Sequence, residues 1–509
     1  MSAAGSRLNG AAAIALALLL SLWFFFVNGG ATFYFDSIEY IDRGHQLLSI
    51  IGFELSPFQD PSVAGTNTAA AIAQDGAVET VDGSRSMVYS LLAGIFFWLG
   101  AVDGLVAMNA VMAVATIWLS CRLAVRDLAN APQPSSIALV AVALSALGSL
   151  PFYVAFVMPD LFTPILLIVA ALLSAFGLKM KTWELVVVTA LGCLAITVSI
   201  SNLAIGLILF PIVVLKAILV SEPRRWLGPS LMLVIVLAGI GEQAILRVAA
   251  KQVEDAEVVY RPFLTARLVQ DGPGFSYLSD RCPTNPEPTC ALLDALSLSD
   301  DPTRFSATNI AFSNELSNGS FQLMTAEDQI NVTQQQFQFF MDVFLDRPIE
   351  TSLAFASNVL RQLTLNSVDM TLQTDAIVER GKGATGMAWG DFEHGRLTAD
   401  TSWLALVNSA QSILYALAAI GVLGLLASGR QPPAVATFLI MILVGIVVNA
   451  IVCGGLSQPA NRYGARVIWL LPVAAVIGGV VFAARRKTDR AGIPDASRDT
   501  SSLGQRNAQ

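Results

Sequence analysis

Long apolar runs separated by short polar breaks dominate the pattern of the chain. A helix needs roughly 20 mostly apolar residues, at about 1.5 Å rise each, to cross the hydrocarbon layer of a bilayer. Runs of that kind lie at residues 11–29, 103–122, 136–156, 161–178, 184–200, 203–220, 227–246, 404–427, 434–453 and 467–484. The pattern therefore predicts an all-α polytopic membrane protein with about ten transmembrane helices.

The placement of Lys and Arg gives these helices an orientation, because cytoplasmic loops carry an excess of both residues. If Arg7 is inside and each predicted span crosses the membrane once, every polar break that contains basic residues lies on the same side as Arg7. These breaks hold Arg122 and Arg126, Lys179 and Lys181, Arg224 and Arg225, Arg430, and the basic run 485–487. Both ends of the chain are therefore predicted to be cytoplasmic.

Two segments require a choice between topologies. Residues 185–215 carry no charge, but the basic residues on both flanks should share a side, so we expect two helices with an outside turn at 199–202. The apolar stretch 87–100 is short, and a span there would move Arg122 and Arg126 outside. We therefore expect it to be a helix lying in the outer interface.

The same pattern divides the chain into four parts. Residues 1–246 form an N-terminal membrane module whose first outer loop is 30–102, and residues 403–487 form the C-terminal membrane helices. Between them, 247–402 is expected to be a small, mainly helical extracytoplasmic domain, with an amphipathic helical stretch near 325–370 interrupted by Pro348. The polar tail 488–509 is expected to be disordered in the cytoplasm.

Composition supports the membrane class and excludes one kind of partner. The chain is 54% hydrophobic and 13% charged, whereas soluble proteins carry roughly 25% charged residues. Since no basic patch with interleaved aromatic residues occurs, nucleic acid is not expected as a partner. Cys282 and Cys290 lie together in a polar outer segment rich in turn-forming residues, where an oxidising compartment permits a disulfide.

Acidic residues just beyond the first span are candidates for chemistry. In a helix, Asp36 shares a face with Tyr40, and Asp42 shares one with His45. A carboxylate at the membrane surface beside an apolar wall can act as a general base, or can hold a metal or a hydroxyl acceptor. An ordinary solvated helix start is the alternative, because acidic side chains suit the positive end of a helix.

Two later outside positions carry charge in apolar surroundings. Asp160 follows the third predicted span and is the one acid within a long uncharged run, although it could simply cap a helix. Arg462 and Arg466 are four residues apart on one helix face and lie outside, against the positive-inside trend. Paired guanidinium groups suit forked recognition of phosphate, and the alternative is that they reach to lipid headgroups.

Taken in order, these segments resemble the GT-C superfamily of membrane glycosyltransferases, which take a sugar from a polyprenyl-phosphate carrier. The acidic motif that follows the first span in that superfamily is matched by 36–40. The basic and aromatic residues of the second juxtamembrane helix are matched by Arg85 and Tyr89, the second acid by Asp160, and the late Arg-Tyr motif by Arg462 and Tyr463. The resemblance covers about 30–210 and 455–475, and the block 267–290 resembles one shared by a group of bacterial membrane proteins.

The resemblance implies transfer of a polyprenyl-phosphate-linked sugar to an extracytoplasmic glycan, lipid or protein. It also implies a bacterial inner membrane, in contact with membrane lipids, and a site that faces the periplasm. The residues assigned to catalysis are Asp36, Glu39 and Asp160. The residues assigned to substrate binding are Arg85, Tyr89, Tyr40, His45, Asn202, Arg462, Tyr463 and Arg466.

Alternatives to this hypothesis stay open at the level of the sequence. Asp36 and Asp160 could share a divalent cation, although no His and carboxylate cluster has metal-ligand spacing. A transporter or flippase would need charged or broken spans near the middle of the membrane. A scaffold protein could keep the fold without the chemistry, because fold does not establish function.

Overall fold

The computed structural model describes residues 3–50, 52–53, 80–128, 131–220, 224–253, 255–313, 318–385 and 393–490. Helices make up most of this part of the chain. Within it, the strands are β1 (Thr80–Asp82) and β2 (Glu257–Val259), which pair in parallel and tie the first outer loop to the start of the outer domain. The predicted all-α class is therefore confirmed.

Seven helices in the described residues are long and apolar enough to cross a membrane. They are α5 (Asp103–Ala124), α8 (Phe162–Phe176) with its short flanking helices, α10 (Ile200–Ile218), α11 (Leu227–Val253), α20 (Leu404–Ala427), α21 (Pro433–Ala450) with the π-helical turn η7 (Ile451–Gly455), and α22 (Asn461–Ile468) continued by α23 (Leu470–Arg490). These helices indicate an integral membrane protein.

The other three predicted spans are represented by shorter or broken helices, so the count of ten is not confirmed. Run 11–29 forms α1 (Ala3–Ser21) and α2 (Trp23–Asn28), and run 136–156 forms α6 (Pro134–Ala146) and α7 (Leu150–Ala155). Run 184–200 forms α9 (Thr182–Thr197), whose 16 residues reach about 24 Å against the roughly 30 Å of a bilayer core. The expected division of 185–215 into two helices is confirmed, but the break lies at 198–199, because residues 200–202 of the expected turn already begin α10.

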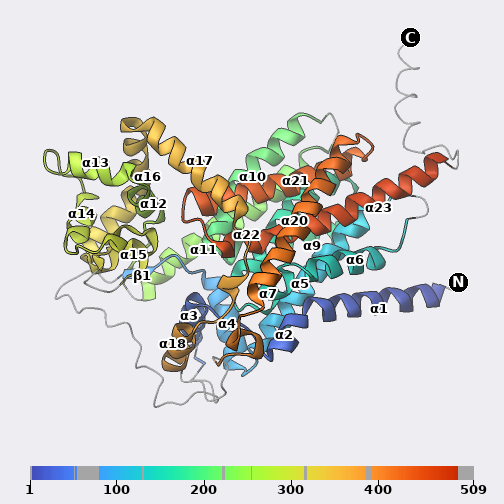
Figure 1. Ribbon diagram of the computed structural model, residues 1–509, viewed down its shortest axis with the longest axis horizontal. Helices are drawn as coiled ribbons and strands as arrows, with labels where there is room; N and C mark the ends of the chain where they lie inside the picture. The colour runs from blue at the N-terminus through green and yellow to red at the C-terminus, as the bar shows by residue number, and fades with distance from the viewer. Residues whose placement is uncertain are drawn as a thin grey trace, which may run out of the picture.

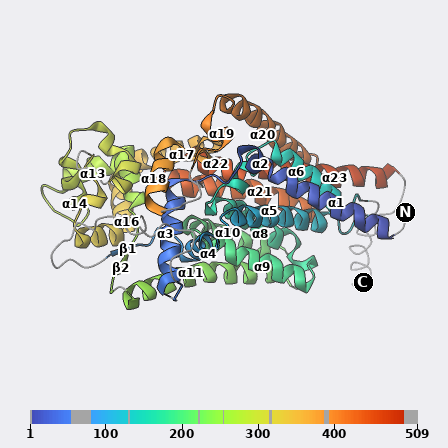
Figure 2. The same cartoon turned by 90° about the horizontal axis from the view of Figure 1, so that it is seen from below.

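The apolar helices run roughly side by side along the long axis of the molecule (Figures 1 and 2). The start of α1 and the end of α23 lie at the same end of this bundle, and the outer domain lies at the opposite end (Figure 1). This arrangement agrees with two termini on one side of a membrane. The last helix continues to Arg490, so the first three residues of the predicted disordered tail 488–509 are helical, and the rest of the tail lies outside the described residues.

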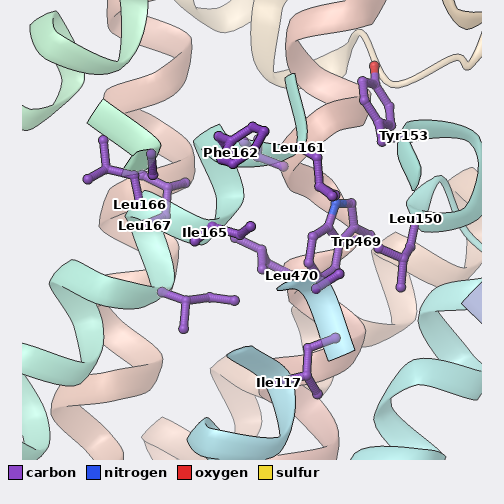
Figure 3. Close-up of a cluster of buried hydrophobic side chains, with 14 of the residues drawn as sticks. Ile117, Leu150, Tyr153, Leu161, Phe162, Ile165, Leu166, Leu167, Trp469 and Leu470 are labelled. Atoms are coloured by element: carbon purple, nitrogen blue, oxygen red, sulfur yellow. The ribbon is translucent and has the colours of Figure 1, made fainter. Parts of the chain in front are cut away.

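The core of the bundle is built around α8, which is buried on every side. Figure 3 shows Leu161 beside Trp469 and Ile165 of α8 beside Leu470, where α22 passes into α23. A helix that is apolar all round is stable only where other elements or lipid surround it. In contrast, α20 leaves large side chains such as Leu406 mostly exposed, as expected for a helix that faces lipid. The central position of α8 fixes its outer end against the last membrane helix.

Residues 247–402, called the outer domain below, are mainly helical, as predicted, and those from Val259 to Val343 share a separate hydrophobic core that includes Leu278 and Phe339. Ile377, later in this segment, belongs instead to the core of the membrane bundle. The helices of the outer domain are α12 (Phe263–Asp271), α13 (Pro273–Arg281), α14 (Cys290–Ser297), α15 (Ala307–Phe312), α16 (Ala326–Asp346), α17 (Pro348–Thr364) and α18 (Asp375–Thr385). The break expected at Pro348 is confirmed, because α16 ends just before it and the proline opens α17, where its missing N–H costs nothing. The predicted disulfide between Cys282 and Cys290 is present.

Candidate functional site

The first half of the site is built by α3 (Phe35–Ile50) and α4 (Met87–Trp98), which follow the first span as two short helices. Their backbones touch where Gly44 meets Gly94, since a Cβ on Gly44 would lie 1.9 Å from the carbonyl oxygen of Ser90. Ser86 caps α4 by accepting from the N–H groups of Val88 and Tyr89. This crossing holds the acidic face of α3 beside Arg85, the residue before the cap.

The second half is built by η1 (Pro159–Leu161), at the outer end of α8, and by α22. Asp160 lies on η1 and is 2% exposed. Two buried hydroxyl groups fix α22 against the bundle: Tyr153 donates to the carbonyl oxygen of Arg462 at 2.5 Å, and Ser149 donates to that of Ala465 at 2.5 Å. The arginines of α22 are therefore placed next to Asp160.

The guanidinium group of Arg462 joins the two halves of the site. Its Nε and Nη2 donate to Asp160 at 3.1 and 2.8 Å, and its Nη1 donates to Oδ2 of Asp36 at 3.1 Å. The other oxygen of Asp36 accepts from Nη2 of Arg85 at 2.6 Å, and Nε of Arg85 donates to Glu39 at 2.9 Å. With Arg466, these residues form an alternating chain of three acids and three arginines, called the charged cluster below.

Electrostatics keep Asp36 ionised. Burial raises the pKa of its carboxyl group, but the positive charges of Arg85 and Arg462 together lower the pKa by more than burial raises it. The pKa of Asp36 therefore lies below the usual value. Aromatic rings complete the surroundings: the guanidinium carbon of Arg462 lies 5.0 Å from the ring centre of Tyr34, and that of Arg85 lies 5.7 Å from Tyr40. Such contacts stabilise a cation in a site with little water.

Arg466 is committed to partners inside the protein. It donates from Nη1 to Asp160 at 3.3 Å, from Nη2 to Asn449 at 2.9 Å, and from the same nitrogen to the sulfur of Cys453 at 3.0 Å. Its side chain is 3% exposed. The paired forks expected from Arg462 and Arg466 therefore both face Asp160, and Arg466 does not lie at a surface that a phosphate could reach.

Four other residues singled out in the sequence differ in how they relate to the charged cluster. The buried ring of Tyr89 packs 4.9 Å from that of Tyr40, and its hydroxyl has no hydrogen-bond partner among the described residues. Tyr463 lies under both arginines of α22, with its ring centre 5.0 Å from the guanidinium carbon of Arg466. His45 is half-buried, and its Nε2 also lacks a partner within the described chain.

Asn202 makes its contacts elsewhere in the fold, between membrane helices. Its side-chain oxygen accepts from Thr163 at 2.6 Å, and its nitrogen donates to the carbonyl oxygen of Ala195 at 2.7 Å. These bonds tie the start of α10 to α8 and α9. Asn202 is therefore a link between membrane helices and is not among the residues that the charged cluster binds.

The outer domain contributes arginines that sequence reasoning missed. Nη2 of Arg380 lies 3.4 Å from Glu39, and Nη2 of Arg261 lies 4.0 Å from Glu39 and 3.0 Å from Asp82. Arg380 lies on α18, which packs against α3. In the sequence both are ordinary basic residues within an acidic segment, and no motif or spacing distinguishes them.

The acids of the charged cluster do not fit a shared divalent cation. Among the described residues, no three His, Cys, Asp or Glu side chains lie together as metal ligands. The guanidinium of Arg462 stands between Asp36 and Asp160 and occupies oxygens of both. A cation bridging these carboxylates would have to take the place of that guanidinium.

Comparisons with known proteins give no indication of function for this chain. No protein-family model matches the chain, and no curated protein is significantly similar to it.

Proposed function

We propose that the chain is a membrane glycosyltransferase that moves a sugar from a polyprenyl-phosphate carrier to an acceptor at the outer face of a bacterial inner membrane. The observation that supports it most is the placement of Arg462 between Asp36 and Asp160. An ionised carboxylate stands there beside a guanidinium group that a second, buried acid holds in position. The group proposed to accept a proton and the group proposed to bind a phosphate are therefore adjacent.

The nitrogens of Arg462 divide into two roles. Nε and Nη2 are held by Asp160, and Nη1 is directed at Asp36. A lipid phosphate oxygen that takes over Nη1 would release Oδ2 of Asp36, while Arg85 keeps hold of Oδ1. Binding of the donor would in this way convert a paired carboxylate into one that can accept a proton.

The transfer then proceeds with a simple balance of bonds. The acceptor hydroxyl attacks the anomeric carbon, its proton passes to Oδ2 of Asp36, and the bond between the sugar and the lipid phosphate breaks. Arg462 stabilises the negative charge that grows on the leaving phosphate, an effect of about 3–4 kcal/mol for a well-placed donor. Asp160 positions Arg462, Arg466 positions Asp160, and Arg85 with Glu39 positions Asp36.

The test is sugar transfer by the full chain in liposomes, measured with a panel of polyprenyl-phosphate sugars. Asp36→Asn should lower the rate by about 10²–10⁴-fold, because the amide cannot accept the proton. Asp82→Asn is the matched control: this acid also lies in the first outer loop and pairs with an arginine, Arg261, yet takes no part in the transfer. Its rate should stay close to that of the wild type at equal protein abundance.

Asp36→Asn with near-normal transfer would move the base to another acid, and Glu39→Gln and Asp160→Asn are the next variants to measure. If all three keep the wild-type rate, the glycosyltransferase proposal is wrong. Thermal melting of each variant separates a folding defect from a chemical one.

One observation favours a scaffold protein as the second candidate. The three acids and three arginines of the charged cluster balance in charge, and every acid is paired. A balanced network of this kind can act as a clamp between the first outer loop and the last membrane helix without any chemistry. The scaffold function requires that the wild-type chain transfers no sugar from any carrier in the panel.

A further inference from the structure

The helix that carries Arg462 and Arg466, α22, begins without a cap from a side chain. Ala460 precedes it in an extended conformation, with φ −147° and ψ 147°. In an antiparallel sheet, the N–H and C=O of an extended residue point to the same side, and one partner residue binds both. The placement of α22 therefore depends on what binds the backbone of Ala460.

The side-chain amide of Gln362, on α17, binds both of these backbone groups. Its Oε1 accepts from the N–H of Ala460 at 2.9 Å, and its Nε2 donates to the carbonyl oxygen of Ala460 at 3.0 Å. Gln362 is 1% exposed. One side chain thus makes the two bonds that a partner strand would make. It fixes the peptide units on both sides of Ala460, and Arg462 follows two residues later.

Close packing around Gln362 prevents its amide from shifting alone. A Cβ on Gly454 of η7 would lie 2.5 Å from the Cβ of Gln362, and a Cβ on Gly464 of α22 would lie 1.7 Å from the carbonyl oxygen of Leu365. Glycine at both positions lets α17 and the turn after it approach the backbone of η7 and α22. The start of α22 is therefore held directly against α17.

The residues after α17 hold the next position of the chain. The Oδ1 of Asn461 accepts from the N–H of Ser367 at 3.4 Å, and its Nδ2 donates to Asp369 at 3.0 Å, at the start of η6 (Asp369–Thr371). The membrane bundle holds the same helix from its other side, through the bond from Tyr153 to the carbonyl oxygen of Arg462. The outer domain and the bundle therefore position α22 together.

The other contact of α17 on this face is made within the outer domain. One turn before Gln362, Asn358 is 8% exposed and donates to Asp271 of α12 at 2.7 Å. Figure 1 shows α17 running from the outer domain to α22. Two buried amides on one helix face thus bind different neighbours. Asn358 joins α17 to the rest of the outer domain, and Gln362 joins it to the start of α22.

We propose that Gln362 is a positioning residue for the donor phosphate, an inference that rests on the proposed glycosyltransferase function. Asp160 holds Nε and Nη2 of Arg462, so Nη1 is the nitrogen that meets the phosphate. By fixing Ala460, Gln362 keeps α22 in the rotation that directs this nitrogen toward Asp36. A displacement of about 1 Å can lower a rate by about 10²-fold, even when its cause lies far from the reacting atoms.

The test compares Gln362→Met with Asn358→Leu in the full chain in liposomes, with the polyprenyl-phosphate sugar that the wild type uses best. Methionine fills the space of glutamine but cannot bind Ala460. The kcat/KM for the donor should fall by up to about 10²-fold, through a higher donor KM and a lower kcat, while the KM for the acceptor stays unchanged.

Asn358→Leu is the matched control, because it removes a buried amide from the same face of α17 without touching α22. Its donor KM should equal that of the wild type. A role of Gln362 in folding alone would lower the amount of active protein and leave the donor KM unchanged. An equal rise of the donor KM in both variants would also contradict the proposal, since the effect would then not depend on Ala460.

A second variant and a binding measurement cover a failure of Gln362→Met to fold. Gln362→Asn keeps the amide but is one methylene too short to bind both groups of Ala460, so it should also raise the donor KM. The dissociation constant of polyprenyl phosphate without a sugar, measured in lipid nanodiscs, should rise in both Gln362 variants.

The binding measurement also separates this inference from the proposed function. A wild-type chain that binds polyprenyl phosphate but transfers no sugar overturns the glycosyltransferase proposal alone, and the dissociation constants then decide the role of Gln362. If the folded Gln362 variants keep the wild-type donor KM and dissociation constant, Gln362 does not position Arg462.

Discussion

The two ends of the helix bundle both bury an acid among arginines, but they build the arrangement differently. At the outer end, Asp160 and Asp36 are joined through Arg462. At the other end, Glu184 on α9 accepts from Nε of Arg122 at 3.0 Å and from Nη2 of Arg126. Glu184 with these two arginines is called the inner cluster below.

The inner cluster joins α9 to the end of α5 and the turn that follows it, and local contacts support it as well. Glu184 accepts from the backbone N–H of Lys181 at 2.7 Å, and so closes the first turn of its own helix. Arg122 lies between the rings of Trp118 and Trp183, and the side chains of Arg122 and Arg126 are 31% and 20% exposed. Every charge in it serves a helix end or reaches water.

In the charged cluster, Asp36 lies in the first turn of α3 and the side chain of Glu39 is 27% exposed, but the end formed by Asp160 and Arg466 has almost no contact with water. Asp160 is neutralised by residues that come about three hundred positions later, and Arg466 is almost fully buried. The hydroxyl of Tyr89 remains unpartnered nearby among the described residues. The difference teaches that an ion pair alone does not mark a functional site. A site is indicated where buried charges depend wholly on tertiary neighbours and a polar group is left without a partner.

The comparison first requires that the two clusters lie on opposite sides of the membrane. Asp127, near the inner cluster, and Asp280, in the outer domain, have side chains that are 60% and 74% exposed. In a Cys193→Ser background, Asp127→Cys should react only with a reagent that enters the cytoplasm, and Asp280→Cys should react with an impermeant reagent added outside intact cells. Reaction of both positions from one side would remove the basis of the comparison.

The largest energetic effect is expected from Arg462→Ala. Removing this partner leaves Asp160, which is 2% exposed, with one remaining ion pair, and breaking a buried pair costs about 3–5 kcal/mol. The free energy of unfolding, measured by steric trapping in bicelles, checks this value. A loss below about 1 kcal/mol would place the charged cluster in the same energetic class as a surface ion pair.

Arg466→Lys should have an intermediate effect. Lysine keeps the positive charge but loses the planar fork that reaches Asp160 and Asn449 together. Leaving such buried acceptors unsatisfied costs about 1–3 kcal/mol, and sugar transfer should fall in parallel because Asp160 loses a support. Wild-type stability and transfer in this variant would show that charge alone holds Asp160.

The inner cluster should tolerate Arg122→Ala with a loss of at most about 1 kcal/mol, since the side chain is partly exposed and Arg126 remains on Glu184. The same steric-trapping measurement serves as the counterpart to Arg462→Ala. Equal losses at both ends would contradict the difference drawn between them.

The smallest effect concerns pH. Because Asp36 has a pKa below its usual value in the folded chain, its contribution to stability is fully present above the ordinary aspartate pKa of about 3.9. The contribution is lost as the pH falls through the lowered value. Thermal melting from neutral pH to about pH 3 should therefore show a shallower acid-side decline for Asp36→Asn than for the wild type. Identical slopes would mean that the arginines do not stabilise the ionised form.

Much of the local structure could be predicted from the sequence. Apolar run length predicted the seven long membrane helices, and charge parity predicted the division between α9 and α10. The break at Pro348 and the Cys282–Cys290 disulfide also followed from residue type and spacing. The shorter helices were overestimated, because run length does not show where a helix breaks, as between α6 and α7.

The candidate site was only partly open to the same reasoning. The pattern singled out Asp36, Asp160 and Arg462, which the structure brings into contact. It also included Asn202, which instead links membrane helices, because a polar residue in an apolar run looks the same whether it binds a ligand or a neighbouring helix. Arg261 and Arg380 were missed, since nothing near them in the chain indicates that the outer domain folds back onto α3.

Hydrophobic run length, proline position and the distribution of basic residues act over one helix or one turn, and the sequence by itself therefore determined the membrane class, most helices and their order. Which nitrogen of Arg462 faces Asp36 and which face Asp160 was decided only by tertiary structure. Those contacts join residues more than three hundred positions apart, and they form only because the buried helix α8 packs against the start of the last membrane helix. No short-range sequence pattern encodes these contacts, because they depend on how all the intervening helices pack against one another.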